Sequence, residues 1–141
     1  MNIFIEYIKI HLKKISKEIN EILNRSDSVY PLNIFIINGK DVMEFIVDYS
    51  LDNTKNMDNY GYAIEIELHK NDKNGYYKLN IDLLEISGTL LHEKSINLSA
   101  NPKDYEKDLN EITKIMHEFR DKLKQLVILN NNNPDWYLTR E

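Results

Sequence analysis

The chain has 141 residues, of which 42% are hydrophobic and 29% charged, and its formal net charge is −5. This length fits one domain, and the composition is that of a globular protein rather than a disordered chain. Cysteine is absent, which excludes a disulfide scaffold, a thiolate zinc site and a cysteine nucleophile. The acidity disfavours general nucleic-acid binding, because nucleic-acid-binding proteins need a basic surface that neutralises phosphates.

The sequence contains no stretch that approaches the roughly 20 apolar residues of a membrane span. Its apolar beginning is interrupted by charged residues such as Glu6 and Lys9, and no small-residue cleavage site follows. This segment therefore differs from a secretory signal peptide. We expect a cytoplasmic protein that does not enter the membrane.

Residues 3–24 are predicted to form an amphipathic helix. Apolar residues recur at alternating spacings of three and four, which keeps them on one side of a helix. These residues are Ile5, Ile8, Leu12, Ile15, Ile19 and Ile22. Pro31 then prevents the helix from continuing.

Residues 32–98 change to a period of two, which is typical of strands. Asn38-Gly39 separates two such stretches, and this dipeptide indicates a hairpin because both residues tolerate positive φ. Further alternating stretches, joined by polar turns, continue to Leu83, and 89–98 is a less regular candidate for a fifth strand. Short turns between alternating strands predict a four- to five-stranded antiparallel meander with one buried face.

Residues 103–129 return to a helical pattern. Pro102 suits the first helical position, and Asn101 is a candidate N-cap. Apolar residues again repeat at spacings of four and three, and they are Tyr105, Leu109, Ile112, Met116, Phe119, Leu123 and Leu126. A run of asparagines at 130–133 and then Pro134 are expected to end the helix.

The sequence thus predicts one α+β domain over residues 1–129, in which the long C-terminal helix packs on one face of the sheet. Residues 130–141 are predicted to form a short tail. Trp136 and Tyr137 in this tail either fold back on the core or dock a partner, since both residue types are favoured interface anchors. A homodimer formed through a helix face remains an alternative to intramolecular helix packing.

Acidic residues dominate the sheet face that the helices would leave uncovered. The predicted alternation places six carboxylates there: Glu44, Asp48, Glu65, Glu67, Asp82 and Glu93. Among the strand positions of this face, only Lys78 clearly opposes them. Such a face would attract a basic protein partner, although a solvated sheet face is also expected to be polar.

The sequence lacks a recognisable catalytic or cofactor-binding motif, so we predict no catalytic residue, no cofactor and no metal site. The four histidines, His11, His69, His92 and His117, show neither H-x3-H nor HExxH spacing. His11 and His117 are expected at the boundary of the helical stripes, and His92 beside Glu93 is expected to be structural. The four glycines form no phosphate-binding loop.

In size, acidity, residue usage and helix–sheet–helix layout, the chain resembles the small immunity proteins that accompany bacterial toxins, including contact-dependent growth-inhibition systems. The resemblance covers most of the chain, but no motif carries it, so no residue is transferred. It implies a non-enzymatic protein that neutralises a toxin, often a nuclease. The alternatives are a secretion chaperone, or a domain that binds a small ligand or a metal on the acidic sheet face and acts as an enzyme.

Overall fold

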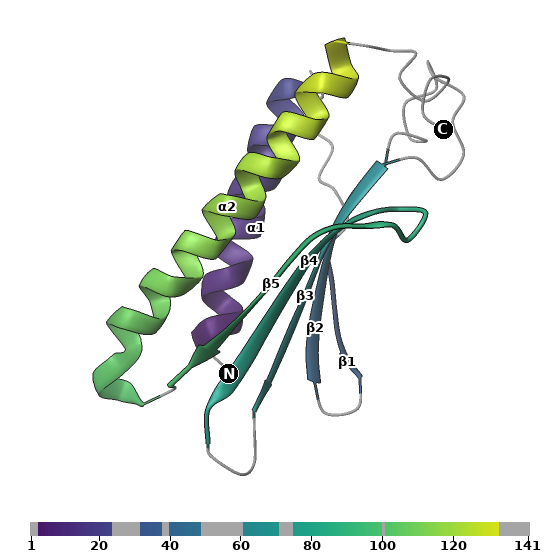
Figure 1. Cartoon of the computed structure of the whole chain (residues 1–141). Helices are drawn as coiled ribbons and strands as arrows, with labels where there is room; N and C mark the ends of the chain where they lie inside the picture. Colours follow the sequence, from purple (N-terminus) through teal and green to yellow (C-terminus); the bar gives the residue numbers. More distant parts are fainter. Residues whose placement is uncertain are drawn as a thin grey trace.

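The computed structural model describes residues 3–23, 32–37, 40–48, 61–70, 75–99 and 101–132. Over these ranges the chain forms, in order, α1 (Ile3–Ile22), β1 (Leu32–Ile37), β2 (Lys40–Asp48), β3 (Gly61–Lys70), β4 (Tyr77–Glu85), β5 (Leu90–Leu98), the 3-10 turn η2 (Pro102–Asp104) and α2 (Tyr105–Asn132). The α+β class and the order helix, sheet, helix are therefore confirmed (Figure 1).

The strands form one antiparallel sheet in the order β1-β2-β3-β4-β5, so each strand pairs with its neighbour in the sequence. This is the predicted meander, and 90–98 is its fifth strand. β1 and β2 pair up to Ile37 and Lys40, which flank the predicted Asn38-Gly39 turn; these two turn residues lie outside the described ranges. A register shift at Leu83 and Leu84 marks a bulge between β4 and β5. The alternation of β5 is weaker because two of its inward positions, His92 opposite Leu83 and Lys94 opposite Ile81, are polar.

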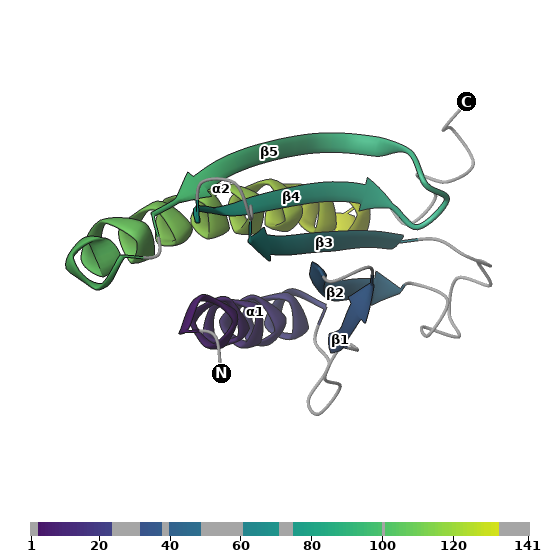
Figure 2. The same ribbon diagram turned by 90° about the horizontal axis from the view of Figure 1, so that it is seen from below.

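Both helices lie on the same side of the sheet (Figures 1 and 2). They run in the same direction, because the sheet returns the chain to the end from which α1 started. The hydroxyl oxygens of Tyr7 and Thr113 lie 2.7 Å apart, and Lys124 Nζ donates to Glu18 Oε1 over 3.3 Å. We call the line of contacts between the two helices the helix seam.

The core lies between the helices and the inner face of the sheet. From α1 it takes Phe4, Ile8, Leu12, Ile15 and Ile19; from the strands Met43, Phe45, Tyr62, Ile64, Ile66, Leu68, Leu79, Ile81, Leu83 and Leu98; from α2 Ile112, Ile115, Met116, Phe119, Leu123 and Val127. Burying one large apolar side chain contributes about 1.5–3 kcal/mol relative to exposing it. The helical stripes and the odd–even pattern of the strands thus correspond to one shared core.

The ends of α2 show one confirmed cap and one wrong boundary. Asn101 caps η2, because its side-chain oxygen accepts a hydrogen bond from the backbone N–H of Lys103 at 3.3 Å. The helix continues to Asn132, past the predicted end at Leu129. A proline disfavours helical geometry at the residue that precedes it. Pro134 therefore restricts residue 133, and the helix can include the asparagines up to Asn132. Residues 133–141 lie outside the described ranges.

Candidate functional site: an acidic row across the sheet

Four of the predicted acidic residues face each other across four strands. The pairing register places Glu44 of β2 opposite Glu65 of β3, Glu65 opposite Asp82 of β4, and Asp82 opposite Glu93 of β5. We call these four residues the carboxylate row. Directly opposed residues in an antiparallel sheet have Cβ atoms about 4.5–5.5 Å apart. The strands therefore bring together four like charges that the sequence separates by up to 49 positions.

The centre of the carboxylate row is electrostatically unfavourable. Glu65 is half-buried, and its pKa is raised by burial, and further by Glu44, Asp82 and Glu67. The pKa of Asp82 is raised by burial and by Glu93 and Glu67. Both shifts mean that the ionised forms are destabilised in the folded protein. A cationic group that approached this face would relieve the repulsion.

The remaining predicted residues lie beside the row or outside the described ranges. Glu67 belongs to the neighbouring row, where it pairs with Val42 and Asn80. Asp48 pairs with Gly61 at the end of β2, but its side chain is outside the described part of the structure, as are Trp136 and Tyr137. The structure thus brings together five of the eight predicted partner-binding residues.

Cations of the sheet do not neutralise the row. Lys78 lies on the predicted face, where it pairs with His69 and Asn97. Along β4 it lies two residues from Asn80 and four residues from Asp82 of the carboxylate row. It is exposed at the side chain. Within the described ranges, the ion pairs involve other residues, and none includes a member of the carboxylate row.

The outer face also contains apolar positions, which the sequence analysis did not anticipate. Ile46 pairs with Ala63 and Ala63 with Leu84, so an apolar row lies directly beside the carboxylate row. Ala63 and Val42 are buried, at 8% and 7% exposure, whereas Ile46 and Leu84 are half-buried and supply the apolar part of the surface. The even-numbered apolar residues of β2, Val42 and Ile46, are the sequence signal for apolar positions on this face. The outer face is therefore a mixed acidic and apolar surface.

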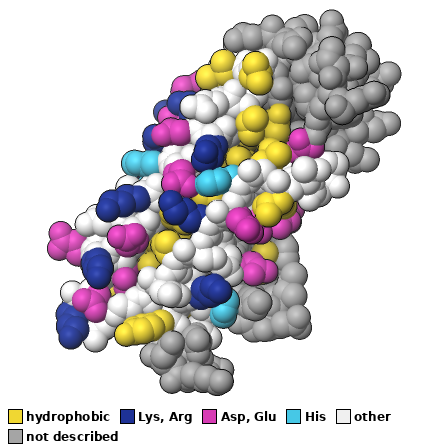
Figure 3. Space-filling view, in the orientation of Figure 1, with side chains coloured by type: hydrophobic (Ala, Val, Ile, Leu, Met, Phe, Trp, Pro, Cys, Tyr) yellow, Lys and Arg dark blue, Asp and Glu magenta, His cyan; other side chains and the backbone are white. Residues whose placement is uncertain are grey.

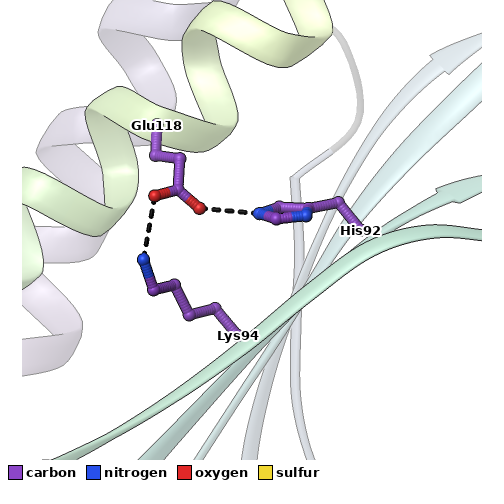
Figure 4. Close-up of polar contacts among 3 residues, drawn as sticks. All are labelled: His92, Lys94 and Glu118. Atoms are coloured by element: carbon purple, nitrogen blue, oxygen red, sulfur yellow. Dashed lines mark hydrogen bonds and ion pairs between the residues drawn. The ribbon is translucent and has the colours of Figure 1, made fainter.

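A second polar cluster joins β5 to α2 on the opposite side of the sheet (Figure 4). Glu118 Oε2 lies 2.6 Å from His92 Nε2, and Lys94 Nζ donates to Glu118 Oε1 over 2.9 Å. These hydrogen bonds lower the pKa of Glu118. His92 therefore contacts Glu118 of α2 and not its sequence neighbour Glu93. A charged residue that faces inward on an edge strand also discourages pairing with another chain, and Lys94 occupies such a position.

The described surface contains two further depressions. One, of about 300 Å³, lies along the helix seam, and the other, of about 480 Å³, lies where β5 leads into α2. Figure 3 shows acidic side chains grouped near the sheet and mixed charges along the helices. Among the described residues, no three histidine or carboxylate side chains are arranged to hold a metal ion. No described helix is long and apolar enough to cross a membrane.

Comparisons with known proteins add no family to this geometry. A scan against protein-family models found no match, and neither curated proteins nor solved structures gave one.

Proposed function

We propose that this protein is a non-enzymatic binding module whose acidic outer face binds a basic protein. The observation that carries the proposal is the carboxylate row. Four carboxylates in register across four strands repel each other in the isolated protein, and a basic partner would offset that repulsion. Acidic patches of this kind also accelerate encounter with a cationic partner.

The partner that fits this face best is a toxin that the protein neutralises. Toxins that cut nucleic acids need basic surfaces to contact phosphates, and a row of carboxylates would compete for the same surface. The helix–sheet–helix layout agrees with the resemblance to immunity proteins of bacterial toxin systems. The apolar row of Ile46, Ala63 and Leu84 lies beside the carboxylate row. Such a combination suits a protein interface, where apolar contacts accompany charged ones.

The test uses a double charge reversal, Glu65→Lys/Glu67→Lys, in a tagged full-length chain. Partners captured from the native cells are identified by mass spectrometry and their affinity is then measured with purified proteins. The matched control is Glu106→Lys/Glu111→Lys, which makes the same charge change on α2. Circular dichroism of both variants verifies the fold.

The proposal predicts one stoichiometric basic partner that high salt releases and that the sheet variant, but not the helix variant, fails to bind. Equal binding by the wild type and the sheet variant would remove the outer face as the binding surface. Absence of any stoichiometric protein partner would instead favour the enzyme or small-ligand alternative.

A further inference from the structure

The helix seam follows a fixed register along its length. The Tyr7–Thr113 hydrogen bond and the Lys124–Glu18 ion pair both join residues 106 positions apart. At these two places the facing groups attract each other. The ends of the seam are therefore complementary, one through hydroxyl groups and the other through opposite charges.

The middle of the seam is different, because it brings basic groups together. His11 and His117 are again 106 positions apart, and their ring centroids lie 5.7 Å from each other. The same register places Lys14 opposite Arg120. All four side chains line the groove of about 300 Å³ between the helices. Arg120 contacts only the neighbouring Asp121 among the ion pairs of the described residues, at 2.9 Å.

The other charged residues of the groove do not cancel this excess. Lys17 adds a further cation, whereas Glu18 and Glu21 are the two acidic lining residues. Glu18 already pairs with Lys124. Among the described residues, those that line the groove all belong to α1 and α2. With neutral histidines, the three cations of the lining exceed its two carboxylates by one charge, in a chain with a net charge of −5.

The positive charges around the groove affect the protonation of His11. Its side chain is buried at 8% exposure, and its pKa is lowered by burial and by the nearby His117, Lys14 and Arg120. Protonation of His11 is thus disfavoured while the groove holds no anion. An anion at the centre of the seam would reverse the effect of these charges.

We propose that the groove between α1 and α2 binds a phosphate-type oxyanion, either free or as the terminal phosphoryl group of a small molecule. Arg120 supplies a planar guanidinium that can bind two oxygens together, and Lys14 supplies a mobile point charge. The imidazoles of His11 and His117 donate from the two sides of the seam. This site is separate from the carboxylate row, so it does not rest on the proposed partner-binding function.

Binding of an anion is expected to take up a proton at His11. The pKa of His11 is lowered below 6.5 in the free protein, and an anion in the groove favours the protonated form, so the affinity for an anion of fixed charge rises as pH falls towards that lowered value. The other titratable or charged groups near His11 and His117 are Tyr7, Lys14, Lys17, Glu18 and Glu21 of α1 and Arg120 of α2. A phosphate group also loses one negative charge as pH falls through its second pKa of about 6, and this loss opposes the effect of His11 on the affinity.

Two titrations of the full chain test the site. Isothermal calorimetry measures binding of inorganic phosphate and of glycerol 3-phosphate, with sodium chloride used to keep ionic strength constant. Nuclear magnetic resonance follows the imidazole signals of His11 and His117 over the same additions. The site variant is Lys14→Gln/Arg120→Gln, and the control is Lys13→Gln/Lys122→Gln, which removes two exposed charges from the same helices.

We expect saturable one-to-one binding, a raised pKa of His11 in the complex, and at least tenfold weaker binding by the site variant only. The site variant relieves repulsion, so its thermal stability should not fall, and a loss of binding then reports the site. Binding of both anions assigns a terminal phosphoryl group, whereas binding of phosphate alone assigns a free anion. Binding of neither, or equal weakening by the control variant, overturns the proposal.

Discussion

Replacing Glu65 by glutamine removes one charge from the centre of the carboxylate row and keeps the size of the side chain. Glu65 faces Glu44 on one side and Asp82 on the other, and Glu67 lies two residues along the same strand. The substitution therefore removes repulsion from both flanking strands at once. We expect the variant to be more stable than the wild type at neutral pH.

The magnitude follows from the number of opposed pairs. Cross-strand pairs contribute roughly 0.2–1 kcal/mol each, and like charges directly opposite each other are destabilising. Two such pairs predict that the free energy of unfolding rises by about 1 kcal/mol. For a domain of this size, that corresponds to an increase in Tm of roughly 3 °C. Because Glu65 is only half-buried, solvent screening keeps the gain near this value.

Urea unfolding of the two proteins measures the gain. At about 0.01 M ionic strength the Debye length is about 30 Å, and at about 1 M it is about 3 Å, so the gain should shrink in high salt. A control variant, Glu111→Gln, removes a carboxylate of α2 that lies outside the row and should not gain stability. If Glu65→Gln is no more stable than the wild type in low salt, the carboxylates of the row do not repel each other appreciably.

The pH dependence of the same pair of proteins checks the cause. The pKa of Glu65 is raised above its ordinary value of 4.5 in the folded protein, so the native state holds this proton more tightly than the unfolded chain. The wild type should therefore lose stability as pH rises from the ordinary value through the raised one. The advantage of the glutamine variant should be absent in acid and complete at neutral pH. An advantage that is independent of pH would exclude relief of charge as its origin.

Three further predictions concern α2 and its start. Glu118→Gln should lower the free energy of unfolding at pH 7 by roughly 0.5–1 kcal/mol, because the ion pairs of Glu118 with His92 and Lys94 are weakened. The pKa of Glu118 is lowered in the folded protein. In urea unfolding at a series of pH values, the difference in stability between variant and wild type should therefore vanish as pH falls through that lowered pKa. Phe119→Ala removes a fully buried ring and should cost about 3–5 kcal/mol in urea unfolding, whereas a loss under 1 kcal/mol would contradict its place in the core. Asn101→Ala removes the N-cap acceptor and should lower Tm by an amount that corresponds to about 1 kcal/mol, while Asn101→Asp should retain most of the stability.

The elements of this fold were predictable because each one carries its own periodicity. The stripe of α1, the alternation of β3 and the cap at Asn101 depend on residues that are close in the sequence, and all three are confirmed. The predicted end of α2 at residue 129 lies three residues before its observed end at Asn132, because an asparagine run disfavours a helix without preventing it.

The candidate site was only half predictable. The alternation predicts that Glu44, Glu65, Asp82 and Glu93 lie on one face. Whether they are direct neighbours depends on the pairing register between adjacent strands, which alternation does not determine. The sequence offers no rule for that register across the polar segment 52–59. The Glu118 cluster was missed for the same reason, since His92 and Glu118 come from different elements and only tertiary packing brings them together.

The helix seam also has a consequence for how the chain reaches its native state. The two halves of the seam are separated by the whole sheet, so α1 is synthesised well before the helix that covers its remaining apolar surface. Contacts of such high sequence separation slow folding, because the chain loses the entropy of closing a long loop before these contacts can stabilise it. Until α2 is complete, the inner face of the sheet stays partly open to other chains. Truncations within α2 should therefore produce aggregation rather than a smaller stable domain.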